Sequence, residues 1–79
     1  MHYVYVIETM AEPKHYYVGL TEDLKARLAG HNAGRSKHTA SLKPWGLVWY
    51  GAFSTRAKAE AFERYLKSAS GRAFQKKHL

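Results

Sequence analysis

Three short segments of the chain are rich in β-branched and aromatic residues, the composition typical of strands. They cover residues 3–7, 15–20 and 45–53. Only the polar break at residues 10–14, which contains Pro13, separates the first two segments. A connection this short favours an antiparallel hairpin between the first strand and the second.

The segment after the second strand has the features of a helix. Thr21 is its expected N-cap, and Glu22 and Asp23 follow in the first turn, where negative charge suits the helix dipole. We expect this helix to run to about Asn32, because Gly34 then stops it.

A polar, basic loop is expected at residues 35–44, before the third strand. Ser54 or Thr55 is the expected cap of a second, longer helix that runs to about Ser68. Gly71 then opens a last basic helical turn.

The order of these elements is ββαβα with a short C-terminal helix. It predicts an α/β fold in which a small three-stranded, mainly antiparallel sheet is flanked by helices. No repeat or linker interrupts the pattern, so we expect a single domain over residues 1–79.

The composition excludes several classes of protein. Cysteine is absent, which excludes a disulfide framework and thiolate metal sites. No apolar run approaches the roughly 20 residues of a membrane helix, and the first residues lack the pattern of a signal peptide. We therefore expect a cytoplasmic protein without a membrane partner, stabilised by its core alone.

The positive charge narrows the expected partners. Thirteen Lys and Arg residues against six acids give a net charge of +7, and no acid occurs between Leu24 and Ala59. A solvated basic face is one explanation, but a surface that follows a phosphate backbone explains the local excess better. The residues expected to contact nucleic acid are Arg35, Lys37, Lys43, Arg72, Lys76 and Lys77.

Two polar residues fall on the apolar stripe of the first helix. Leu24 and Leu28 define that stripe, and a turn of about 100° per residue places His31 within it and Arg27 at its edge. An arginine beside a buried stripe is either a side chain that reaches out to solvent or part of a site. Both alternatives stay open at this point.

The second helix carries two carboxylates at different angles. Its apolar arc comprises Ala59, Phe62, Tyr65, Leu66 and Ala69. Glu63 lies at about 100° from Phe62, on the shoulder of this arc, and Glu60 at about 160°, toward solvent. Ordinary ion pairs would join Glu60 to Arg64 and Glu63 to Lys67. If the protein binds a divalent cation, Glu63 is the best candidate ligand.

The first two strands are rich in tyrosine. Alternation places Tyr3 and Tyr5 on one face of the first strand and Val4 and Val6 on the other. For any single tyrosine, a place in the core is the simpler explanation. Gly19, near the end of the second strand, indicates a turn or a close approach of the backbone.

Together these segments resemble the GIY-YIG nuclease domain family. Residues 3–5 (YVY) stand in the place of the GIY element, with Tyr3 for its first glycine, and residues 17–19 (YVG) are a close form of the YIG element. Residues 19–28 resemble the helix that carries the family's arginine, here Arg27, and His31 matches a position often held by His or Tyr.

The resemblance continues to the end of the chain. Residues 61–67 resemble the second helix of the family, whose metal-binding glutamate falls on Glu63. Residues 67–72 resemble the small single-domain bacterial branch, which is similar to the N-terminal nuclease module of the excision-repair incision enzyme.

This resemblance implies hydrolysis of phosphodiester bonds with one Mg²⁺ or Mn²⁺ ion. Glu63 would hold the ion, Arg27 would donate to the phosphoryl oxygens, and Tyr17 or Tyr5 would orient or deprotonate the water. A tyrosine base at neutral pH costs about 4 kcal/mol unless nearby cations lower its pKa. His31 is an alternative base with a more suitable pKa.

The expected partner is DNA, with RNA or single-stranded DNA left open. The resemblance implies a DNA endonuclease, and the alternative is a non-catalytic nucleic-acid-binding module on the same scaffold. We expect a monomer whose binding depends strongly on salt and only weakly on sequence.

Overall fold

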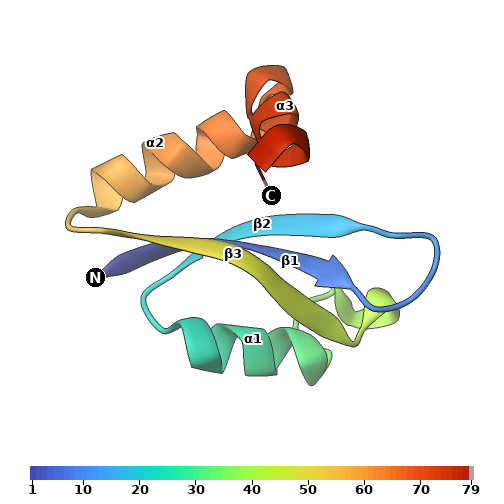
Figure 1. The fold of residues 1–79 in the computed structure, drawn as a ribbon. Helices are drawn as coiled ribbons and strands as arrows, with labels where there is room; N and C mark the ends of the chain where they lie inside the picture. Colours follow the sequence, from blue (N-terminus) through green and yellow to red (C-terminus); the bar gives the residue numbers. More distant parts are fainter. Residues whose placement is uncertain (79) are drawn as a thin grey trace.

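The computed structural model describes residues 1–78, apart from the side chains of Ala69, Phe74 and His78. Its elements, in chain order, are β1 (His2–Thr9), β2 (Tyr16–Thr21), α1 (Leu24–Asn32), the single-turn helix η1 (Ala40–Leu42), β3 (Trp45–Phe53), α2 (Arg56–Lys67) and α3 (Ala69–His78) (Figure 1).

The three strands form one antiparallel sheet in the order β2-β1-β3. The central strand β1 pairs with β2 through the expected hairpin, in a register that sets Tyr5 opposite Gly19. On its other side β1 pairs with β3, and the register shifts between Val6 and Ile7. The predicted α/β fold with a three-stranded antiparallel sheet is confirmed.

Helices cover both faces of this sheet. Figure 1 shows α1 on one face and α2 and α3 on the other. We refer to these as the α1 face and the α2 face, and the alternation of β1 assigns its side chains to one or the other as the sequence predicts. No helix in the described part of the chain is long and apolar enough to span a bilayer.

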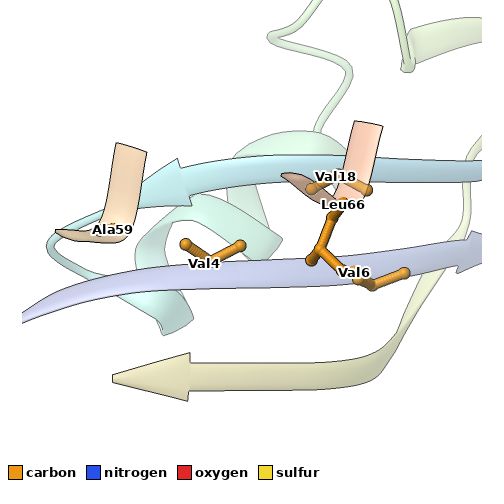
Figure 2. Close-up of a cluster of buried hydrophobic side chains, with 5 residues drawn as sticks. All are labelled: Val4, Val6, Val18, Ala59 and Leu66. Carbon is orange, nitrogen blue, oxygen red and sulfur yellow. The ribbon is translucent and has the colours of Figure 1, made fainter. Parts of the chain in front are cut away.

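The α2 face holds an aliphatic cluster. Its buried members, drawn in Figure 2, are Val4, Val6, Val18, Ala59 and Leu66. The α1 face holds a second cluster, whose buried hydrophobic members are Tyr5, Ile7 and Trp45. Leu24 and Leu28 of α1 pack against this second cluster, which confirms the apolar stripe predicted for the first helix.

The N-cap of α1 is Asp23, so the prediction of Thr21 is wrong. The Asp23 carboxylate accepts a hydrogen bond from the backbone N–H of Ala26 over 3.1 Å. Thr21 is instead the last residue of β2, and its hydroxyl accepts from the N–H of Asp23. Asp and Thr are both good N-cap residues, so capping preference does not distinguish them. The helix begins after Asp23 because β2 extends through Thr21, one residue past its predicted end. The helix ends at Asn32 as expected, and Gly34 adopts a positive φ of 77° beyond it.

Helix α2 begins after Thr55, one of the two expected caps, whose hydroxyl accepts from the N–H of Lys58. The last helix is longer than the single turn expected, because α3 extends over ten residues. Gly71 lies inside α3, where a Cβ atom would be 1.8 Å from the carbonyl oxygen of Tyr65. The absence of a side chain at Gly71 therefore lets α3 pack closely against the end of α2.

Candidate active site

Tyr5 lies in the middle strand and is only 1% exposed. Its partner on β2 is Gly19, where a Cβ atom would lie 2.3 Å from Tyr5 Oη. The tyrosine ring thus lies across the backbone of Gly19, and this position of the sheet has no space for a side chain. The close backbone approach expected at Gly19 is confirmed.

Helix α1 brings two polar side chains to the hydroxyl of Tyr5. Arg27 Nε donates to Tyr5 Oη over 3.2 Å, and His31 Nε2 lies 2.8 Å from the same oxygen. Tyr17 on β2 is the fourth member, with its ring centroid 5.1 Å from that of His31 and 6.4 Å from that of Tyr5. The structure therefore gathers Tyr5, Tyr17, Arg27 and His31 into one cluster on the α1 face.

His31 is enclosed by the protein. It is 1% exposed, and its other ring nitrogen, Nδ1, lies 2.7 Å from Thr39 Oγ1. Both nitrogens therefore have protein partners, Tyr5 on one side and Thr39 on the other. This placement does not fit the alternative in which His31 takes a proton directly from the attacking water.

Burial is the main influence on the pKa values of two members of this cluster, Tyr5 and His31. It raises the pKa of Tyr5, because the cost of burying a charge outweighs the opposing hydrogen bond and charge of Arg27. Arg27 does act to lower the pKa of Tyr5, as we expect for a neighbouring cation, but its effect is smaller than that of burial. Burial, with a further contribution from the charge of Arg27, lowers the pKa of His31. His31 is therefore neutral at physiological pH.

A hollow of about 400 Å³ lies beside this cluster. Three predicted site residues line it, one each from β2, α1 and α2: Tyr17, Arg27 and Glu63. The remaining wall consists of Gly19 and of His2, Leu20, Thr21, Glu22, Arg56 and Glu60. Tyr5 and His31 are not part of the wall and lie behind it.

The two carboxylates of α2 differ in exposure as the wheel predicts. The Glu63 side chain is 22% exposed and that of Glu60 is 42% exposed. Glu63 forms the expected ion pair with Lys67, at 3.4 Å. Glu60 pairs with Arg56, also at 3.4 Å, so the predicted pair with Arg64 is wrong.

Glu60 also lines the hollow, which corrects the expectation that it faces only solvent. Arg56, Glu60 and Glu63 follow one another at intervals of four and three residues, so they share one side of the helix. Sequence reasoning missed Arg56 as a residue of this wall, although this spacing from Glu63 is a signal that identifies it.

Glu63 is the carboxylate best placed to hold a divalent cation. Among residues 1–78, no group of three or more acidic or histidine side chains could hold a metal ion together. Mg²⁺ usually takes one or two carboxylates and keeps several waters, and substrate phosphates supply further ligands. A single half-buried carboxylate beside Arg27 fits a site of that kind, in which the nucleic acid completes the coordination.

The basic residues predicted to contact nucleic acid are all exposed and form two groups. The group that follows α1 comprises Arg35, Lys37 and Lys43. The group on α3 comprises Arg72, Lys76 and Lys77. Arg72 and Lys76 line a second hollow of about 1000 Å³ between β2, β3, α2 and α3, and Tyr17 borders both hollows.

Sequence reasoning also missed Thr39. The segment at residues 35–44 reads as a polar loop, and a single threonine within it has no periodic pattern that indicates burial. In the structure Thr39 is 0% exposed, and its hydroxyl contacts His31. Only the tertiary fold shows that this loop belongs to the site.

Known proteins are similar in sequence to this chain over most of its length. A UPF0213 protein of Streptococcus pyogenes serotype M3 is 39% identical over 72 residues, which cover 90% of this chain and 76% of the relative. A UPF0213 protein of Haloquadratum walsbyi is 40% identical over 68 residues, which cover 85% of this chain and 74% of the relative.

No solved structure matches the chain. The sequence model of the GIY-YIG catalytic domain, in contrast, matches residues 1–78, a range that includes both tyrosine-rich strands, the arginine of α1 and the glutamate of α2. The chain therefore belongs to the GIY-YIG catalytic domain family.

Proposed function

We propose that the protein is a metal-dependent endonuclease that hydrolyses phosphodiester bonds in DNA with little intrinsic sequence preference. GIY-YIG domains form a nuclease family, whereas the names of the curated relatives state no activity. The observation that carries the proposal is the hollow in which Tyr17, Arg27 and Glu63 meet. These side chains supply a hydroxyl, a cation and a carboxylate around one space.

Arg27 stabilises the phosphoryl oxygens as negative charge builds on them. Its Nε–H is already bonded to Tyr5 Oη, which fixes the plane of the guanidinium group. A further side-chain hydrogen bond links Arg27 to Tyr17, and the remaining N–H donors of the guanidinium group bind phosphate oxygens. In this arrangement Tyr5 is a support for Arg27, in keeping with its burial and its raised pKa.

Glu63 would hold one Mg²⁺ or Mn²⁺ ion, which would supply polarisation of the phosphate and stabilisation of the leaving oxygen. Tyr17 contacts the attacking water and orients or deprotonates it. Of the two candidate tyrosines, Tyr17 lines the hollow and Tyr5 does not, and this difference favours Tyr17 for the contact with water.

The exposed basic residues bind the phosphate backbone on either side of the reacting bond. Because Tyr17 borders both hollows, we expect a strand that binds beside this residue to contact Arg72 and Lys76 as well as Arg27. Binding of this kind releases counterions, so the affinity should fall steeply with salt concentration.

The test is cleavage of supercoiled plasmid DNA and of end-labelled DNA and RNA, with Mg²⁺, Mn²⁺ or EDTA. We expect the wild type to cleave DNA only with metal. Glu63→Gln should lower the rate by about 100-fold or more, because it removes the metal-binding carboxylate.

Glu60→Gln is the matched control, since Glu60 lies on the same side of α2 and lines the same hollow. It should change the rate by less than about threefold, a loss below 1 kcal/mol. If wild type binds DNA but cleaves neither DNA nor RNA with either metal, the protein is a non-catalytic binding module. If Glu63→Gln cleaves as fast as wild type, the metal assignment is wrong.

A further inference from the structure

A chain of hydrogen bonds runs from the hollow into the loop that follows α1. Arg27 Nε contacts Tyr5 Oη, Tyr5 Oη contacts His31 Nε2, and His31 Nδ1 contacts Thr39 Oγ1, at 3.2, 2.8 and 2.7 Å. Tyr5, His31 and Thr39 are each 1% exposed or less. The orientation of Arg27 is therefore coupled to a residue on the far side of the cluster.

The directions of these bonds follow from the chemistry of the groups. Arg27 has only N–H donors, so Tyr5 Oη must accept from it. A neutral histidine has one donor nitrogen and one acceptor nitrogen, and two tautomers are possible for His31. In one, Nε2 accepts the phenolic hydrogen and Nδ1–H donates to Thr39. In the other, both bonds are reversed.

Acidity selects between the two tautomers. The phenol of Tyr5 is a much stronger acid than the alcohol of Thr39, so it is the better donor to an imidazole nitrogen. The alcohol oxygen is the better acceptor, because the lone pairs of a phenol are partly delocalised into its ring. The adjacent positive charge of Arg27 strengthens the phenol as a donor. The favoured state is therefore the tautomer of His31 with its hydrogen on Nδ1.

Thr39 is held in place to accept that hydrogen. The indole Nε1 of Trp45 donates to the carbonyl oxygen of Thr39 over 2.8 Å. The side-chain amide of Asn32 in turn binds both the N–H and the carbonyl of Trp45. Since Asn32 follows His31 in α1, the same helix positions both the imidazole of His31 and the Trp45 residue that binds Thr39.

We infer that Thr39 is a positioning residue for the site. Its hydroxyl holds His31 in the Nδ1–H tautomer, so that Tyr5 donates to His31 Nε2 and presents a lone pair to Arg27. In each of the three bonds the donor is then the group nearer the hollow and the acceptor is the group nearer the loop. Arg27 stays oriented toward the phosphate. The kinetic part of this inference rests on the proposed nuclease function, and the tautomer does not.

The tautomer is measured directly by ¹⁵N NMR of the full chain with labelled histidine, at pH 7.5. We expect His31 to show a protonated Nδ1 and an unprotonated Nε2 in the wild type and in Thr39→Ser, which keeps the hydroxyl. Thr39→Val has no acceptor, so its His31 should shift toward the Nε2–H form. A wild type that already has the Nε2–H form overturns the inference.

Cleavage kinetics provide the second readout. Thr39→Val should lower kcat by about 10- to 100-fold, because even a small displacement of Arg27 from the phosphate is costly in rate. KM should stay within about twofold, because substrate contacts remain, and Thr39→Ser should restore most of kcat.

Thr9→Val is the matched control. Thr9 is also 0% exposed, and its hydroxyl donates to the carbonyl of Leu42 in the same loop, but it does not contact His31. It should leave the tautomer and kcat unchanged. If Thr9→Val lowers kcat as much as Thr39→Val, Thr39 acts only by stabilising the loop. If the wild type shows no cleavage and its His31 is nevertheless the Nδ1–H tautomer, the proposed function is wrong and the assignment of the tautomer still holds.

Discussion

The α2 face of the sheet is packed with apolar side chains, aliphatic where they are fully buried and partly aromatic around them, whereas the α1 face encloses a tyrosine, a histidine and a threonine joined by hydrogen bonds. Aliphatic packing tolerates small shifts, and the free energy that it contributes scales with the buried area. Hydrogen-bonded packing depends on the position of each atom, because an unpaired buried polar group is costly. The first face supplies stability, and the second sets the geometry of the hollow.

Leu66→Ala should have the largest effect on stability. Leu66 is fully buried among Val6 and Val18 (Figure 2). Truncating a buried leucine usually destabilises a protein by about 2–5 kcal/mol, through lost burial and the cavity left behind. Urea unfolding measures this loss. The NMR signals of His31, on the other face, should show the same tautomer as in the wild type.

Leu47→Ala is the control for that comparison, since Leu47 is 40% exposed. Its loss of unfolding free energy should stay below about 1 kcal/mol. Equal losses in the two variants would show that the aliphatic cluster is not the main source of stability.

Gly19→Ala should damage the α1 face with a smaller loss of stability. The new Cβ would lie 2.3 Å from Tyr5 Oη, so the ring must move away from Arg27 and His31. Such overpacking costs about 1–3 kcal/mol in unfolding free energy. The cleavage rate should fall by at least about tenfold, because a small misplacement of catalytic groups is expensive.

Gly46→Ala, in β3, is the control for the effect of replacing any glycine in a strand. Its Cβ would lie 3.3 Å from the end of the flexible Met10 side chain, which can shift. The variant should keep the wild-type rate. If Gly19→Ala also keeps that rate, the position of Tyr5 does not control the site.

The smallest expected effect is a dependence of stability on pH. The pKa of His31 is lowered in the folded protein, so below pH 6.5 the unfolded chain binds a proton that the folded chain does not. Stability should therefore fall as the pH drops below about 6.5 and continue to fall until His31 also becomes protonated in the fold. Melting temperatures between pH 8 and pH 5 should decrease more for the wild type than for His31→Gln. Parallel curves would contradict the buried, neutral state of His31.

Much of the fold was predictable because its signals are local. The strands carry runs of β-branched and aromatic residues, and the alternation of Tyr5 with Val4 and Val6 indicates which side chains share a face. The N-cap at Asp23 and the length of α3 were not predictable. They depend on where β2 ends and on how closely Gly71 approaches α2, and both are tertiary features.

The candidate site divides in the same way. Arg27, His31 and Glu63 occupy informative positions on helical wheels, so periodicity makes them candidates and the family resemblance then selects them. Thr39 lies in a segment without periodicity and contacts His31 only because the loop folds back onto α1. The net effect of burial on the pKa of Tyr5 likewise needs the packed structure, since its sequence neighbours do not show how deeply it lies.

Single-turnover cleavage of DNA by Arg27→Ala, with saturating protein and Mg²⁺ or Mn²⁺, tests the central claim most directly. Loss of a donor to the developing charge should lower the rate by about 100- to 1,000-fold. The free energy of unfolding should change by less than about 1 kcal/mol, because Arg27 is exposed. A rate within about threefold of the wild type would contradict the assignment of Arg27 to the site of chemistry.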